Sequence, residues 1–190
     1  AWRAAFWAAA VAEAAAEGAA VDAEALGAEL QRRFDDTRLG ELAWVEGAVE
    51  VVSRLRAAGM EMCVITNGHP EVQHPKLQAL RASELFGSRM IVGGDEVLAG
   101  RGEKPDPRIF ARACELTGIP PEESIHVGDS LASDVRGALD AGLLAAVWVS
   151  PGGAAPPAEG PRPHHTVASV AQLPAVLAAL GHPDLPPADA

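Results

Sequence analysis

The sequence predicts an α/β fold in which a parallel β-sheet is flanked by helices. Between residues 46 and 180, apolar runs of strand length alternate with segments of helical periodicity, which is the pattern of βαβ units. Residues 1–45 carry helical periodicity alone. The chain has 190 residues, of which 48% are hydrophobic, and this is enough to bury the core of one domain and part of a second.

The first 45 residues are rich in alanine and predict two helices that pack side by side. The large apolar residues of the first helix recur at helical spacing: Trp2, Phe6, Trp7 and Val11. Gly18 interrupts this pattern, and Asp22 is an N-cap signal for a second helix that reaches Phe34. We expect the three aromatic residues of the first helix to lie in the core of this helical hairpin.

The elements of the remaining chain follow in alternating order. The expected strands span residues 60–65, 90–92, 124–127, 144–149 and 166–170. The expected helices span residues 49–58, 76–81, 107–116, 133–141 and 173–180. Gly59 and Gly142 are helix-ending signals, whereas Asp106 and Pro107 are helix-starting ones. Pro75 is tolerated only in the first turn of its helix, which sets the start of that helix.

Charge and composition exclude several classes of function. Acidic residues number 26 and basic residues 15, so the net charge is −11, which argues against nucleic acid as a partner. No apolar run approaches the ~20 residues that cross a bilayer, so no membrane association is expected. Cys63 and Cys114 are too few for a disulfide scaffold and fit buried thiols in a reducing compartment. The sequence therefore predicts a cytoplasmic protein, and it carries no signal for an oligomeric state.

Two polar triplets directly follow expected strands, namely Thr66-Asn67-Gly68 and Gly128-Asp129-Ser130. Parallel α/β sheets bind ligands beyond the carboxyl ends of their strands, so both triplets are candidate site segments. The first triplet offers a hydroxyl and consecutive backbone N–H groups, and its small residues let an anion approach the backbone. A plain turn is the alternative interpretation of this triplet.

Lys104 lies just before the helix expected at residues 107–116. The lysine ammonium is a compact charge that suits a phosphate oxygen or an acyl phosphate. The alternative is a solvated lysine in a loop.

Asp129 and Asp134 lie on one short segment that could direct both carboxylates toward one point. Two close carboxylates repel each other unless a cation lies between them. Hard oxygen ligands beside a phosphate site suit Mg²⁺. The alternative is an N-cap and a first-turn acid, each worth up to ~1 kcal/mol to the helix.

These segments resemble, in order, the motifs of the haloacid dehalogenase-like hydrolase superfamily. The motifs are a hydrophobic strand with Thr66-Asn67-Gly68, then the run from Lys104 to Phe110, then His126-Val127-Gly128-Asp129-Ser130 with Asp134. The resemblance covers about residues 45–180. It implies a Rossmann-like core, phosphate-ester hydrolysis through an aspartyl-phosphate, and a partial helical cap at the N-terminus.

The resemblance also implies a role for each phosphate-binding residue. Thr66, with the backbone of Asn67 and Gly68, would hold the phosphoryl oxygens. Lys104 would neutralise the charge shared by the nucleophile and the phosphate, so Thr66 and Lys104 are the candidate catalytic residues. These roles fit phosphoryl transfer, which depends mainly on positioning and electrostatic stabilisation.

The cofactor implied by the resemblance is Mg²⁺. Asp129 would ligate the ion, and Asp134 would support the metal site. A chain of net charge −11 repels a phosphorylated substrate at long range, so positive charge must be supplied locally by Lys104 and the metal.

A narrower resemblance concerns the substrate. Residues 73–77, 92–96 and 146–149 are similar to those of N-acylneuraminate-9-phosphatases, and residues 2–39 look like part of the helical cap of that subgroup. The implied partner is a small phosphorylated sugar acid such as N-acylneuraminate 9-phosphate. Phosphoglycolate and other sugar phosphates are alternative substrates within the family.

The sequence departs from the family pattern at its first motif. That motif, Asp-x-Asp at the end of a central apolar strand, supplies the nucleophile and the general acid. Asp35-Asp36 is no match, because it follows a helix rather than a strand. We therefore expect a chain truncated at its N-terminus and inactive by itself, with a partial cap at 1–45, a core at 46–180 that lacks its first strand, and a tail at 181–190.

Two other classes of protein are alternatives to the enzyme. A signalling receiver domain also uses an aspartyl-phosphate, a threonine and a lysine, but its acidic pair precedes the threonine, and here Asp129 and Asp134 follow Lys104. A non-catalytic remnant that binds phosphate or a partner protein is the second alternative. The retained Thr66, Lys104 and Asp129 favour the enzyme over that remnant.

Overall fold

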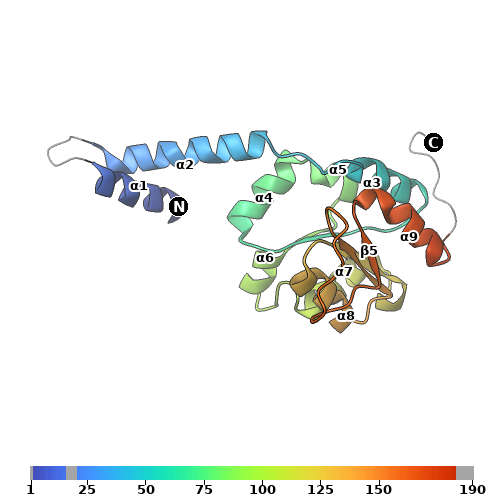
Figure 1. Ribbon diagram of the computed structural model, residues 1–190. Coiled ribbons are helices and arrows are strands. Elements are labelled where there is room, and N and C mark those ends of the chain that lie inside the picture. Colours follow the sequence, from blue (N-terminus) through green and yellow to red (C-terminus); the bar gives the residue numbers. More distant parts are fainter. Residues whose placement is uncertain (1, 16–20, 183–190) are drawn as a thin grey trace. The chain divides into compact units, whose positions relative to one another are not determined.

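The chain forms two compact units, Ala1–Ala43 and Trp44–Ala190 (Figure 1). The computed structural model describes residues 2–15 and 21–182, so the expected break at Gly18 and most of the expected tail lie outside the described residues. No helix of the described part of the chain has the length and apolar character that crossing a membrane requires.

The first unit is a hairpin of two helices, α1 (Trp2–Ala14) and α2 (Ala23–Gly40). Asp22 caps α2, since its side chain accepts a hydrogen bond of 3.0 Å from the backbone N–H of Ala25. The N-cap expected from the sequence is confirmed.

The two helices are joined by contacts of Trp7. Its ring lies 6.4 Å from the ring of Phe34, and its Nε1 donates to Gln31 at 3.2 Å. Phe6, in contrast, is 72% exposed, so the expectation that it lies in a core is wrong. The reason is geometric, because consecutive residues of a helix point about 100° apart and only one of this pair can face α2.

The second unit contains two parallel sheets. Strand β1 (Val64–Thr66) pairs with β2 (Met90–Val92), and the other sheet has the order β3-β4-β5, formed by Ile125–Gly128, Ala145–Val149 and His165–Val167. The expected parallel α/β fold is confirmed. Within the described residues, β1 pairs with no strand except β2, and β3 with none except β4, so both triplet-bearing strands lie at a sheet edge.

Helices and short helical turns connect the strands. The α-helices are α3 (Ala48–Ala57), α4 (Pro70–Ala79), α5 (Ala82–Phe86), α6 (Gly93–Leu98), α7 (Pro107–Thr117), α8 (Arg136–Asp140) and α9 (Leu173–Ala179). The short turns are the 3₁₀ turns η1 (Pro121–Glu123) and η3 (Val170–Gln172) and the π-helical turn η2 (Leu131–Val135).

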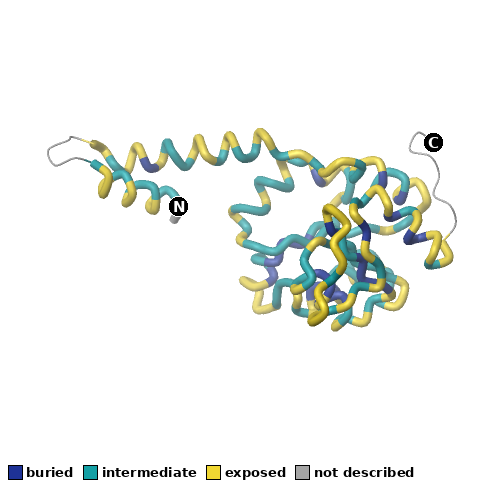
Figure 2. The backbone as a smooth tube through the Cα atoms, in the orientation of Figure 1, coloured by how far each residue is buried: buried dark blue, intermediate teal, exposed yellow. Residues whose placement is uncertain are grey.

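The core of this unit consists of two hydrophobic clusters on opposite faces of strand β4. Val147 belongs to the cluster that includes residues of α3 and α9, and its neighbour Ala146 to the one that includes residues of α7 and α8. Alternation along a strand places such neighbours on opposite faces, so helices cover both sides of the sheet, as parallel sheets require. Figure 2 shows that most of the buried positions lie in this unit. Burial raises the pKa of the Cys63 thiol to about 11.

Several expected strand boundaries are wrong. The strand expected at residues 60–65 is β1, which covers only Val64–Thr66, because its partner β2 offers three residues for pairing. The last strand is His165–Val167 rather than 166–170, and its register is set by pairing of Val167 with Val149.

Two helices also differ from the expectation. Helix α4 begins at Pro70, capped by the ring of His69, so Pro75 lies inside the helix and not in its first turn. Helix α6 begins at Gly93, directly after β2, and is not among the helices expected from the sequence. The His69 cap and the packing of the unit outweigh the low helix propensity of the proline and glycine at these positions.

Candidate active site

The turn that follows β1 carries the first candidate triplet. Thr66 donates its hydroxyl proton to Gln73 Oε1 on α4 at 3.2 Å. The backbone oxygen of Gly68 accepts a hydrogen bond of 3.1 Å from the N–H of Gly94, at the start of α6. The start of α6 and the side chain of an α4 residue therefore hold this turn at the carboxyl end of β1.

Lys104 lies against this turn rather than in solvent. Its Nζ donates to the backbone oxygen of Ile65 at 3.0 Å and to Asp134 Oδ1 at 2.7 Å. The side chain is 11% exposed. The alternative of a solvated loop lysine is therefore wrong, because the ammonium fills hydrogen-bonding positions between β1 and η2.

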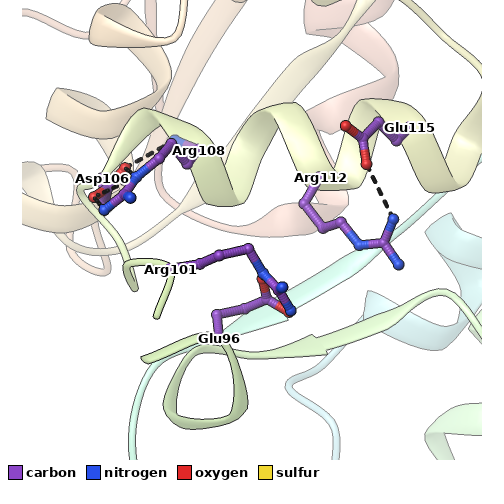
Figure 3. A network of polar contacts seen from close by, with 6 residues as sticks. All are labelled: Glu96, Arg101, Asp106, Arg108, Arg112 and Glu115. Atoms are coloured by element: carbon purple, nitrogen blue, oxygen red, sulfur yellow. Dashed lines mark hydrogen bonds and ion pairs between the residues drawn. The ribbon is translucent and has the colours of Figure 1, made fainter. Parts of the chain in front are cut away.

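The loop that carries Lys104 is fixed by ion pairs on both sides (Figure 3). Arg101 forms a bidentate pair with the buried carboxylate of Glu96, and its backbone N–H donates to the Glu96 backbone oxygen at 2.8 Å. Asp106 caps α7 through the N–H of Arg108 at 2.9 Å and also pairs with the Arg108 side chain. These bonds lower the pKa of Asp106 to about 2.

Asp134 is the buried carboxylate at the centre of the candidate site. Its Oδ1 contacts Lys104 and also lies 3.0 Å from His126 Nε2, and its Oδ2 accepts the N–H of Ser130 at 2.9 Å. Gly128 permits this packing, because a Cβ there would lie 2.3 Å from the Asp134 carboxyl carbon. Burial by itself raises the pKa of Asp134, but the hydrogen bonds from His126 and Lys104 outweigh it and hold the pKa below its ordinary value.

Asp129 differs from Asp134 in its surroundings. Asp129 is exposed, and its backbone oxygen accepts a hydrogen bond from Trp148 Nε1 at 2.8 Å. The carboxylate has no hydrogen bond or ion pair with any residue in the described part of the chain. Asp129 is therefore the acid of this pair with oxygens available to a ligand.

The surroundings of Asp129 and Asp134 show how far each carboxylate is suited to bind Mg²⁺. The described residues include no group of three or more acidic, histidine or cysteine side chains placed to hold a metal ion. Mg²⁺ is commonly held by one or two carboxylates together with waters and substrate phosphates, so Asp129 alone fits as one ligand. Both Asp134 oxygens are already occupied by protein groups, so Asp134 fits as support for the Asp129 loop through Ser130.

The structure connects the candidate segments by hydrogen bonds. Lys104 contacts Ile65, which precedes Thr66, and also Asp134, which in turn holds Ser130 beside Asp129. The Asp35-Asp36 pair lies on α2 in the other unit, where Asp35 pairs with Arg38.

The sequence assigned no role to three polar residues of the site: Gln73, Glu103 and His126. Gln73 and Glu103 lie within or beside the quoted motifs, but nothing local indicates that they contact the Thr66 turn. His126 could have been found, since a histidine inside an otherwise apolar strand needs a buried partner.

A sequence model of haloacid dehalogenase-like hydrolases matches residues 2–142. The chain therefore belongs to this hydrolase family, which confirms the resemblance read from the motifs. Among solved structures, it is similar to 2-haloacid dehalogenase from Pseudomonas syringae pv. Tomato DC3000, with TM-score 0.69, 27% identity and coverage of 94% of this chain and 70% of that one. A HAD phosphatase from Thermococcus onnurineus gives TM-score 0.64 at 28% identity and covers 78% of this chain and 63% of that one.

Curated relatives are phosphatases by name. The N-acylneuraminate-9-phosphatase of Rattus norvegicus is 35% identical over 156 residues, which are 82% of this chain and 60% of the relative. The enzyme of the same name from Homo sapiens is 37% identical over 141 residues, with coverage of 74% and 54%. A phosphoserine phosphatase from Thermus thermophilus is 40% identical over 101 residues, with coverage of 53% and 38%. The chain spans at most 60% of the length of these relatives.

Proposed function

We propose that this chain belongs to a Mg²⁺-dependent phosphatase of the cytoplasm that hydrolyses a small phosphorylated metabolite. The observation that carries the proposal is the buried Lys104–Asp134 ion pair of 2.7 Å, held against the end of β1 beside Thr66. A lysine fixed at the carboxyl end of a parallel strand, next to a hydroxyl and backbone N–H groups, forms a site for a phosphoryl group.

In this proposal each residue has a defined task. The Thr66 hydroxyl and the backbone of Asn67 and Gly68 hold phosphoryl oxygens, and the Lys104 ammonium neutralises their charge. The Gly68 N–H donates to Glu103 Oε2 at 3.0 Å, so a phosphoryl oxygen reaches it only after that carboxylate turns away.

Two further tasks are the binding of Mg²⁺ and the acceptance of the phosphoryl group. Asp129 is the carboxylate that would hold Mg²⁺, and the ion, when bound, supplies positive charge beside the phosphoryl oxygens. The aspartate that accepts the phosphoryl group is not assigned to any residue of this chain.

The proposed substrate is a sugar acid phosphate such as N-acylneuraminate 9-phosphate. Its support is the name shared by two relatives that cover 82% and 74% of this chain. Phosphoglycolate-type and other sugar phosphates are the alternative substrates, since relatives named for phosphoglycolate and glyceraldehyde 3-phosphate cover 51% and 60% of the chain. A remnant that binds phosphate or a partner protein without turnover is the alternative of another class.

The first prediction tests this proposal by assay. The 190-residue chain is compared with a form extended at its N-terminus by the Asp-x-Asp strand of an N-acylneuraminate-9-phosphatase. We expect the extended form to hydrolyse N-acylneuraminate 9-phosphate only with Mg²⁺. The Asp129→Asn variant of this form should lose at least about 100-fold in kcat/KM, because it removes a metal-binding carboxylate.

The control is Asp140→Asn, which removes an exposed carboxylate on α8 and should leave the rate unchanged. Faster turnover of phosphoglycolate or phosphoserine would contradict the proposed sugar acid substrate but would still support a phosphatase. Phosphate binding without hydrolysis of any ester would reject the enzyme in favour of the binding remnant.

A further inference from the structure

The side chain of Asn67 pairs with the backbone of Lys104, 37 residues further along the chain. The Lys104 N–H donates to Asn67 Oδ1 at 3.0 Å, and Asn67 Nδ2 donates to the Lys104 backbone oxygen at 2.7 Å. One amide side chain thereby satisfies both polar backbone groups of one residue. The Gly68 N–H adds a third bond of 3.0 Å to Glu103.

These bonds join the loop of Asn67 and Gly68 to the loop of Glu103 and Lys104. Gly93 packs closely against both loops, because a Cβ at this position would be 2.6 Å from the Glu103 Cβ and 3.1 Å from Asn67 Oδ1. The loop is also held by the Glu96–Arg101 pair before it and by the Asp106 cap after it. The Asn67 amide is the one of these contacts that reaches Lys104 itself.

The backbone position of Lys104 decides where its ammonium lies. Lys104 Nζ contacts Ile65 and Asp134 only if the start of the side chain lies at a fixed place beside β1. A freely moving lysine side chain loses conformational entropy when it is fixed, and a fixed backbone lowers the entropy that remains to be lost.

We infer that Asn67 is a positioning residue, which acts through its side-chain amide on the backbone of Lys104 and so places the ammonium. This inference deepens the proposed function and rests on it for its meaning in catalysis. In this inference the Asn67 side chain positions Lys104, and the Asn67 backbone still holds the phosphoryl group.

The sequence offers a direct measurement, because Lys104 and Lys76 are its only lysines and Asn67 its only asparagine. In the 190-residue chain labelled with ¹⁵N-lysine, NMR reports the exchange of each ammonium's protons with water, and Lys104→Arg assigns the two signals. We expect slow exchange for Lys104, because its ammonium makes two hydrogen bonds.

The test compares Asn67→Ala with the unaltered chain. Loss of both amide bonds should speed exchange at Lys104 by about tenfold, the size expected for hydrogen bonds of ordinary net strength, and leave Lys76 unchanged. Gln172→Ala is the matched control, since it also removes a side-chain amide that accepts from a backbone N–H, that of Ala168 at 2.7 Å. It should alter neither lysine.

A near-isosteric variant covers the case in which Asn67→Ala does not fold. Asn67→Asp keeps an acceptor for the Lys104 N–H but places an oxygen against the Lys104 carbonyl, so exchange at Lys104 should again rise. Unchanged exchange at Lys104 in a folded variant would overturn the inference, as would an equal rise at Lys76.

This measurement needs no substrate, so its outcome is independent of whether the proposed phosphatase activity is found. In the extended form, if it is active, Asn67→Ala should lower kcat by about tenfold and change KM by less than about twofold, since a displaced ammonium weakens transition-state stabilisation. A rise in KM with unchanged kcat would instead reject the positioning role in favour of a role in binding alone.

Discussion

At the scale of single residues, the site depends on how a buried carboxylate keeps its charge. The side chain of Asp134 is 5% exposed, which by itself favours the neutral acid. Lys104, His126 and the Ser130 N–H supply three contacts to its two oxygens, and together they lower its pKa. The charge pair is thus a structural feature of the fold as well as part of the candidate site.

The same contacts predict a pH-dependent loss of stability in Asp134→Asn. The substitution leaves Lys104 buried without its counter-ion, and breaking a buried pair on one side costs about 3–5 kcal/mol of the free energy of unfolding. Because the folded-state pKa is lowered, the stabilisation is complete above the ordinary carboxyl value of 3.8 and is lost as the pH falls below it. Denaturant unfolding should therefore show the largest difference from wild type at pH 7 and a smaller one near pH 3.

Asp140→Asn serves as the comparison, because Asp140 is about half exposed and its contact with Arg136 is 3.9 Å. Its effect should stay below about 1 kcal/mol at either pH. A pH-independent loss in Asp134→Asn would contradict the charge-based explanation.

The sequence predicts some of these residues and not others, for a physical reason. Thr66, Lys104 and Asp129 each stand next to a strand end or helix start, so local pattern and motif order indicate them. The Lys104–Asp134 pair spans 30 residues and the Asn67–Lys104 contact 37, and local periodicity carries no information about such pairings. His126 belongs to the second group, since its partner is chosen by the packing of η2 against β3.

At the scale of elements, α4 shows where packing overrides a local rule. Pro75 lies inside this helix, where its ring removes the hydrogen bond to the oxygen of Glu71. The sequence pattern therefore misplaces the helix start, although Pro70 at N1 and the His69 cap are ordinary start signals. The β1 boundary fails for a related reason, because strand length depends on the partner β2.

We expect Pro75→Ala to stabilise the protein. It restores one hydrogen bond inside α4 but adds freedom to the unfolded chain, so the net gain should be about 2 kcal/mol. Thermal unfolding measures this gain, with Pro70→Ala as control, because a proline at N1 costs the helix nothing and its removal should change stability by less than about 1 kcal/mol. A lower midpoint for Pro75→Ala would mean that the ring contributes packing that outweighs the missing bond.

At the scale of the whole molecule, the two compact units differ in what they bury. In the hairpin of α1 and α2, Gly27 is the one buried residue among those whose burial is described. The unit Trp44–Ala190 buries two apolar clusters on the two faces of β4. Stability follows buried apolar area, at about 25 cal/mol per Å², so the two units should differ in stability.

The four tryptophans allow this difference to be measured, since Trp2 and Trp7 lie in the hairpin and Trp44 and Trp148 in the larger unit. A variant with Trp44→Phe and Trp148→Phe reports on the hairpin alone, and one with Trp2→Phe and Trp7→Phe on the larger unit. We expect fluorescence of the first variant to change at lower urea than that of the second, because the hairpin gains so little from burial. Circular dichroism of both variants should then show a helical loss that precedes the main transition, whereas a single shared midpoint would mean that the hairpin draws its stability from the rest of the protein.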